Sequence, residues 1–181
     1  MIERRIIENC IKGDLNNFPE LVDILSPFAF SVAMRMLGDE AEADDIVQES
    51  IITVWQKIGR LKNPDGFRSW FYRIVINKCF DRMRKLKKNP EACYDERAWR
   101  TISDMLSEGP SVRLENAEIG LIVNTLTLKL SPRQKAVFIL SDLEEKSQEE
   151  IAAITGISRL SVKSNLYHAR KRIGEQIKKY M

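Results

Sequence analysis

Apolar side chains in the C-terminal part of the chain recur at the spacing of one helix face. From residue 162 to residue 177 they follow one another at steps of four, three, four and four, and the positions between them are polar and largely basic. Because an α-helix turns once in about 3.6 residues, this spacing predicts a long helix with one packed face and one cationic face. The packed face is predicted to comprise Val162, Leu166, Ala169, Ile173 and Ile177.

The N-terminal half carries its own helix start and stop signals. Gly13 ends a helix predicted over residues 2–12. A second helix opens at Asn17 and ends at Gly38, and Pro27 inside it is expected to kink or split it. The pattern therefore predicts two consecutive helices.

A third and a fourth helix follow. Asp39, with Glu42 three residues later, caps the third, and a turn at residues 63–66 precedes the fourth, predicted over residues 67–86. The apolar positions expected to pack are Val47, Ile51, Val54, Trp55 and Ile58 in the third helix and Phe71, Ile74, Val75 and Cys79 in the fourth.

The C-terminal half has a helix-turn-helix pattern. Helix starts are predicted at Ser131, which precedes a proline, and at Ser147, which begins the Ser-x-x-Glu pattern of a capping box. Gly156 separates the second of these helices, which is short, from the long basic helix, which Ser158 caps. A short helix, a glycine turn and a newly capped helix together predict a helix-turn-helix.

Composition agrees with an all-α fold. Gly (8) and Pro (6) are scarce in 181 residues, and strand-like alternation is nearly absent. Residues 89–112 lose periodicity and read as a linker. We predict two small helical domains joined by a flexible linker, at residues 1–88, 89–112 and 113–181, with the helix-turn-helix in the C-terminal domain.

No membrane span, metal site or other cofactor is expected. No apolar run approaches the roughly 20 residues that cross a bilayer, and acids interrupt the first apolar stretch, so we expect a cytoplasmic protein without a signal peptide or membrane insertion. Cys10, Cys79 and Cys93 show no Cys-x-x-Cys spacing, and the chain has a single histidine. These features favour reduced thiols over disulfides or a metal site.

Charge is segregated along the chain, although the net charge is only +3. Residues 39–49 hold six acids and no base, whereas residues 67–88 hold eight bases and one acid, and residues 159–181 hold seven bases and one acid. Two basic helices and one acidic stretch predict two nucleic-acid contacts and a separate surface for another partner.

The basic helix of the helix-turn-helix is predicted to lie in the major groove of duplex DNA. Phosphate contacts would supply affinity, and base-edge contacts would supply sequence selectivity. The alternative is a solvated surface helix, while a general-base role for His168 lacks a nucleophile or acid nearby in the sequence. The candidate DNA-binding residues are Arg159, Ser161, Lys163, Ser164, Tyr167, His168, Arg170, Lys171 and Arg172.

The N-terminal half pairs an acidic helix with a basic aromatic one. Aromatic groups beside cations suit unstacked bases as well as duplex phosphate, although Trp70 at such a position more often belongs to the core. The acids at the start of the third helix exceed what capping requires and would repel DNA, which favours a basic protein partner. Asp45 and Glu49 have the spacing of a carboxylate metal site, but no third ligand is evident, which leaves a metal-dependent nuclease as a rival hypothesis.

Three stretches of the sequence, taken in their order along the chain, resemble a known protein family. They are MLGDEAEADDIVQESIITVWQKI, FRSWFYRIVINKCFDRMRK and LSPRQKAVFILSDLEEKSQEEIAAITGISRLSVKSNLYHARKRI. Together they resemble a bacterial RNA polymerase sigma factor of the extracytoplasmic-function group of the sigma-70 family. The first resembles region 2.2, the second resembles regions 2.3 and 2.4, and the third resembles region 4.

This resemblance implies a non-enzymatic subunit that binds core RNA polymerase, directs it to promoter DNA and is held inactive by an anti-sigma factor. The helix-turn-helix would read the duplex −35 element. The third helix would dock on the polymerase through Asp44, Asp45, Gln48, Glu49, Ile52 and Trp55. The fourth helix would engage the opened −10 element through Arg68, Trp70, Arg73, Asn77, Lys78, Asp81, Arg82 and Arg84.

Two residues depart from the family pattern. Asn165 and His168 stand where arginine is common, which affects the expected −35 preference but not the class of protein. The alternative function is a stand-alone helix-turn-helix regulator that binds an operator as a dimer. That alternative leaves the acidic and aromatic helices of the N-terminal half without a role.

Overall fold

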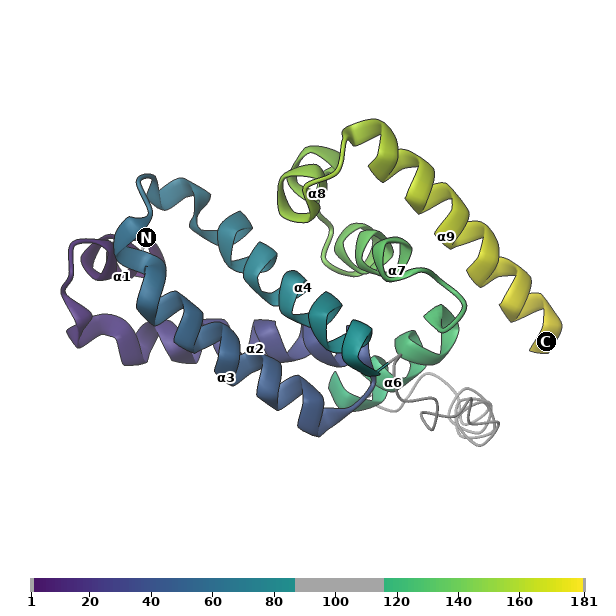
Figure 1. Cartoon of the computed structure of the whole chain (residues 1–181), viewed down its shortest axis with the longest axis horizontal. Coiled ribbons are helices and arrows are strands. Elements are labelled where there is room, and N and C mark those ends of the chain that lie inside the picture. The colour runs from purple at the N-terminus through teal and green to yellow at the C-terminus, as the bar shows by residue number, and fades with distance from the viewer. Residues whose placement is uncertain (1, 87–115, 181) are drawn as a thin grey trace.

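The computed structural model describes residues 2–86 and 116–180, and every regular element within them is helical (Figure 1). The all-α prediction is confirmed, whereas the predicted linker and Cys93 lie outside the described residues. The helices are α1 (Ile2–Ile11), α2 (Phe18–Leu37), α3 (Glu40–Lys57), α4 (Phe67–Leu86), α6 (Asn116–Thr127), α7 (Pro132–Phe138), α8 (Gln148–Thr155) and α9 (Arg159–Tyr180). Single helical turns span Leu15–Asn17, Ile58–Arg60, Pro64–Gly66 and Ile139–Leu143.

Most helix starts use the predicted capping side chains. The Asp39 carboxylate accepts a hydrogen bond from the Glu42 amide at 2.9 Å and begins α3. Ser131 and Ser147 each take part in a complete capping box, and the Ser158 hydroxyl accepts from the Ser161 amide at 3.2 Å at the start of α9. Each bond satisfies an amide that the first helical turn leaves without a backbone partner, which stabilises the start by about 1 kcal/mol.

Two details of α2 differ from the sequence prediction. Asn17 precedes the helix as predicted but makes no capping hydrogen bond, because its side-chain oxygen accepts from the Asn9 amide nitrogen at 3.0 Å instead. The helix also continues through Pro27 without a break, so of the two predicted alternatives, a kink or a split, the split is wrong. Proline removes one backbone donor, and the packing of α2 against α3, α4 and α6 compensates for that loss.

Glycine ends the two helices at which the chain must reverse sharply. Gly38 and Gly156 have φ values of +71° and +73°, a left-handed conformation that costs glycine little. Their amides donate to the carbonyls of Met34 and Ala152, at 2.8 Å and 2.9 Å, so each helix ends with a satisfied carbonyl. The stops predicted at these glycines are confirmed.

The predicted packed faces are largely buried. In α4 the side chains of Phe71, Val75 and Cys79 are buried and Ile74 is half-buried. Val162, Leu166, Ala169 and Ile173 of α9 are also buried.

Two positions were predicted wrongly as packed. Trp55 is 49% exposed and touches Phe18 edge to face, with ring centroids 4.7 Å apart, because α3 turns Ala43, Ile46, Ser50 and Val54 towards the core. Ile177 is 38% exposed, and Gln176 takes the buried position at this end of α9.

The two halves of the chain pack against each other. The main core cluster runs from α1 through to Leu166 of α9, and α8 lies beside α4 (Figure 1). Glu144 pairs with Arg35 and accepts from the Tyr72 hydroxyl at 3.3 Å, while the Lys146 ammonium lies 4.9 Å from the centre of the Tyr72 ring. In this arrangement α4 packs on α2, α3 and α8 and keeps part of its surface exposed.

One lysine is buried at the junction between the halves. Lys135 of α7 is 2% exposed, and its ammonium donates to the Asn124 side-chain oxygen of α6. Burial lowers its pKa to about 7, with Cys79 of α4 close by. Burial likewise raises the pKa of Cys79 to about 12. Both groups are therefore stabilised in their uncharged forms.

None of the described helices combines the length and the apolar character that crossing a bilayer requires.

Candidate nucleic-acid and protein interfaces

The long helix α9 presents a continuous open face. Leu160, Ser164, Tyr167 and Lys171 recur at i, i+4, i+7 and i+11, opposite the buried stripe, and all four are exposed. Figure 1 shows α9 at an outer edge of the molecule, with α7 and α8 on its inner side. The predicted DNA-binding residues Lys163 and His168 are exposed beside this face.

Three arginines along α9 are held by neighbouring elements. Arg159 pairs with Glu149 of α8 at 2.5 Å, and Arg170 pairs with Asp142 at 2.7 Å. Arg172 donates to the Lys129 carbonyl at 3.2 Å and to the Gln134 side chain at 3.3 Å. These contacts connect α9 to α8, to the Ile139–Leu143 turn, to Lys129 and to α7. No ion pair of Lys163 or Lys171 is seen within the described residues, so both ammonium groups face solvent.

A shallow hollow lies where α9 meets the start of α8. It is lined by side chains of both helices, with Tyr167 64% exposed. The Tyr167 and His168 rings meet edge to face, with centroids 5.4 Å apart. The Ser161 hydroxyl, in contrast, is within 2.9 Å of the Ser158 hydroxyl and is occupied in the capping turn. The lining residues are Gln148, Lys163, Leu166, Tyr167, Arg170 and Lys171.

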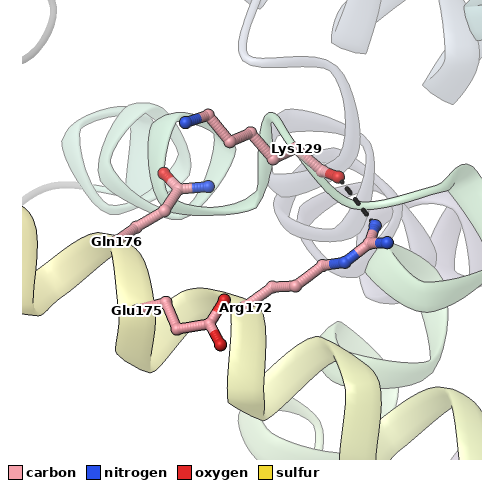
Figure 2. Close-up of a pocket in the computed structure, with 4 residues that line it drawn as sticks. All are labelled: Lys129, Arg172, Glu175 and Gln176. Atoms are coloured by element: carbon pink, nitrogen blue, oxygen red, sulfur yellow. Dashed lines mark hydrogen bonds between the residues drawn. The ribbon is translucent and has the colours of Figure 1, made fainter.

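Figure 2 shows a second hollow, at the other end of α9. Lys129, Arg172, Glu175 and Gln176 line it, and the dashed line marks the bond from Arg172 to the Lys129 carbonyl. The side-chain amide nitrogen of Gln176 is buried there, and it has no hydrogen-bond partner among the described residues. Arg172 therefore belongs to the packing of α9 on the α6–α7 connection as much as to the cationic face.

The residues predicted to engage the −10 element are more enclosed. Arg73 donates to the Ala153 carbonyl of α8 through both Nε, at 3.1 Å, and a terminal nitrogen. Trp70 is half-buried against the core, with its ring 5.8 Å from that of Phe67. Asp81 pairs with Arg84 at 3.3 Å at the surface, and Arg68 and Asn77 are exposed.

An ionic cluster joins α4 to α3. Arg82 pairs with Glu42, with Asp45 at 3.4 Å and with Glu49 at 3.1 Å, and Lys78 pairs with Glu49 at 3.2 Å. Two cations predicted to contact DNA and two acids predicted to contact the polymerase thus meet within the chain. Because Arg82 is mostly buried, its charge is stabilised by these carboxylates rather than by water.

The outer face of α3 remains open. Asp44, Asp45, Gln48 and Glu49 are all exposed, as predicted. Ile52 and Trp55 are 55% and 49% exposed, and they form an apolar strip at the edge of the acids. An acidic face with an exposed tryptophan can bind a basic partner that also offers an apolar surface.

The carboxylates of the described part of the chain bear on the rival hypothesis of a metal-dependent nuclease. No group of three or more His, Cys, Asp or Glu side chains is placed to hold a metal ion there. Asp45 and Glu49 instead share Arg82.

The perturbed carboxyl pKa of Glu150 has a structural cause, because the Ser147 amide donates to this carboxylate at 2.8 Å and lowers its pKa.

Three residues of these surfaces escaped sequence reasoning. Glu42 holds Arg82, and its i, i+3, i+7 spacing with Asp45 and Glu49 was the available signal. Leu160 is 78% exposed on the open face of α9, where an apolar residue among polar neighbours was the available signal. No local signal marked Lys135, because its burial depends on Cys79 and Asn124, which are distant in sequence.

Comparisons with known proteins match both halves. The family model for Sigma-70 region 2 matches residues 21–89, and that for Sigma-70 region 4 matches residues 121–173. The ECF RNA polymerase sigma factor SigW of Bacillus subtilis is 30% identical over 98% of this chain and 97% of its own length. The RNA polymerase sigma factor SigV of the same species is 33% identical over 83% of this chain and 84% of its own length.

The fold is also shared with a solved structure. CnrH, in complex with the cytosolic domain of CnrY, superposes with a TM-score of 0.70 over 98% of both chains, at 24% sequence identity.

Proposed function

The chain belongs to the extracytoplasmic-function RNA polymerase sigma factors of the sigma-70 family, and we propose which of its surfaces contacts which partner. As a sigma factor it binds core RNA polymerase and directs promoter-specific transcription initiation. The stand-alone dimeric regulator is not favoured, because the family match extends over the N-terminal half as well.

We propose that α9 reads the duplex −35 element. The observation that carries this assignment is the open face of α9, on which Lys163 and Lys171 flank exposed Ser164 and Tyr167 while the opposite stripe is buried. A helix in the major groove needs such a face, with cations for phosphates and shorter side chains for base edges. The other residues assigned to this contact are Arg159, Ser161, His168, Arg170 and Arg172.

We propose that α4 engages the −10 element. Its exposed side chains include Arg68, Asn77 and Arg84, and the half-buried Trp70 adds an aromatic surface for an unstacked base. Arg73, Lys78 and Arg82, which are paired within the chain in this structure, would exchange those partners for DNA. The proposed domains are residues 1–88 for this element and for docking, 89–112 for the linker, and 113–181 for the −35 element.

We propose that the outer face of α3 docks on the polymerase. Its acids would pair with basic groups of the polymerase while Ile52 and Trp55 bury their exposed area. The protein would then act without catalysing a reaction, and in the cytoplasm, where polymerase and chromosome meet. CnrH was solved bound to CnrY, and an anti-sigma factor that covers the same surfaces is the corresponding proposal for this chain.

Asp45→Ala combined with Glu49→Ala is expected to weaken assembly with core polymerase by at least tenfold, because two docking carboxylates are lost. Glu42→Gln is the matched control, because it disturbs the same Arg82 cluster from its less exposed side. Co-elution with core polymerase would measure both. Equal losses of polymerase affinity in the two variants would indicate that the docking surface lies elsewhere than on the outer face of α3.

Transcription in vitro tests the function as a whole. Core polymerase from a related bacterium would transcribe fragmented genomic DNA with and without the protein, and the 5′ ends of the RNA would be sequenced. A sigma factor predicts new starts that share two upstream motifs at a fixed spacing. Polymerase binding without any new start, across several core enzymes, would contradict the proposal.

A further inference from the structure

Leu160 is the most exposed large apolar side chain of the described residues, at 78%. It lies in the first turn of α9, on the open face, one turn before Ser164 and two turns before Tyr167. It belongs to neither of the two core clusters. Nothing in the packing of residues 2–86 and 116–180 accounts for a leucine at this position, since a polar residue would leave the contacts described there unchanged.

The backbone that carries Leu160 belongs to a capped helix start, with a surface ion pair next to it. Arg159 pairs with Glu149 of α8 at 2.5 Å, and the Ser161 amide donates to the Ser158 hydroxyl at 3.2 Å. A side chain on a capped and bridged turn is presented in a defined direction, as a specific contact requires.

The surroundings of Leu160 favour DNA as its partner. Lys163 lies one turn further on the same side of α9, Lys171 continues the open face, and both are exposed. A membrane or an apolar protein groove would have to desolvate these ammonium groups, whereas duplex DNA offers phosphates to them. In the major groove, the feature that an aliphatic side chain recognises is the 5-methyl group of thymine.

We propose that Leu160 is a specificity-determining residue that packs on the 5-methyl group of a thymine in the −35 element. This inference rests on the proposed function and adds a preference that the cationic and hydroxyl groups of α9 do not supply. Leu160 selects thymine by apolar contact, and Ser164 and Tyr167 contact the positions that follow along the groove.

Removal of single methyl groups from the DNA tests this contact. Holoenzyme made with the wild-type protein would first select its preferred −35 element from a promoter library randomised at that element. Each thymine of the selected element would then be replaced by deoxyuridine, which lacks only the methyl group. Stability of the promoter complex would be measured for wild type, for Leu160→Ala and for Leu128→Ala, which truncates an exposed leucine of the α6–α7 connection.

We expect one thymine at which deoxyuridine destabilises the wild-type complex by about fourfold, the effect of one buried methyl group. Leu160→Ala is expected to bind thymine and deoxyuridine equally at that position, while Leu128→Ala behaves as wild type. Circular dichroism would verify that Leu160→Ala keeps its helical content.

Other outcomes overturn the inference and leave the function standing. These are a selected element without thymine, a methyl effect of the same size in Leu160→Ala, or no methyl effect at all. Loss of binding to a protein partner with unchanged promoter behaviour would assign Leu160 to a protein interface instead. Failure of the wild-type holoenzyme to select any element would contradict the proposed function itself.

Discussion

The two basic helices, α4 and α9, look alike in sequence and differ in the folded chain. Each carries cations along one side and an apolar stripe along the other. In α4 the cations Arg73, Lys78 and Arg82 bond to α8 or to the acids of α3. In α9, Arg159, Arg170 and Arg172 are also bonded to neighbouring elements, but Lys163 and Lys171 on the open face are exposed.

This difference shows that the charge of a helix does not by itself say which of its cations can bind nucleic acid. Charge composition identifies a helix that can bind nucleic acid, but the packing of neighbouring helices decides which cations are ready to do so. α9 packs on α6, α7 and α8 and keeps the opposite face open, whereas α4 packs on α2, α3 and α8, which lie on more than one side of it. The surface proposed for the −35 element is thus open in this arrangement, and the surface proposed for the −10 element is partly engaged within the chain.

Val162→Asp is expected to have the largest effect, because it removes the packing that positions α9 and with it the open cationic face. Val162 is fully buried, and an unpaired carboxylate there should cost about 3–5 kcal/mol. We expect the α6–α9 part of the chain to lose its cooperative unfolding transition in thermal melts followed by circular dichroism. A cooperative, wild-type-like melt would refute the assignment of the buried stripe.

Lys135→Met tests the junction that encloses α4. Burial lowers the pKa of Lys135 from its ordinary 10.5 to about 7, so the unfolded chain binds more protons between these two values. Stability should therefore rise with pH in this window, by up to about 1.4 kcal/mol per pH unit, and the cost of burial should be largest below pH 7.

Methionine keeps the length of the side chain but cannot be protonated, so Lys135→Met should remove this slope and stabilise the protein most at and below pH 7. Urea unfolding between pH 6.5 and 9 measures both effects. If the free energy of unfolding depended on pH in the same way in both proteins, Lys135 would not be buried in its uncharged form.

Arg82→Met compared with Arg84→Met tests the difference between an enclosed and an exposed arginine of α4. The Arg82 side chain is 17% exposed among three carboxylates, and that of Arg84 is 72% exposed. Loss of the shared cation should destabilise the protein by about 1–3 kcal/mol, whereas Arg84→Met should change stability by less than about 0.5 kcal/mol. Chemical denaturation of both variants would decide, and equal effects would contradict the enclosed state of Arg82.

Lys171→Ala has the smallest expected effect and tests the availability of α9. A cation that contacts a phosphate contributes about 0.9 to the slope of log K against log salt concentration. The promoter complex of the variant should show a slope lower by about that amount. Lys12→Ala, an exposed lysine at the end of α1, is the control. An unchanged slope for Lys171→Ala would place this lysine away from the DNA backbone.

Local signals in the sequence predicted the helices and their caps. Ser131, Ser147 and Gly156 act through atoms within four residues, so their roles are readable without the fold. Helical periodicity likewise predicted most of the buried stripes of α4 and α9, although α4 also buries Tyr72 and Ile76 because it has neighbours on more than one side.

What the sequence did not predict depends on contacts between distant segments. Trp55 was expected to pack, but the neighbours of α3 bury Ala43 and Ile46 instead, and the ring remains half-exposed. The pairing of Arg73 with Ala153 spans 80 positions, and the burial of Lys135 needs α4 and α6 together. No periodicity within one helix reports such a neighbour.

Photo-cross-linking in promoter complexes tests most directly the claim that the two basic helices of one chain contact two separate elements. A photoreactive amino acid would replace Ser164 of α9 in one protein and Asn77 of α4 in another, since both side chains are exposed. With core polymerase and a promoter identified in vitro, the account predicts that residue 164 cross-links near −35 and residue 77 near −10. Cross-links of both residues to the same element, or of residue 77 to no DNA, would contradict it.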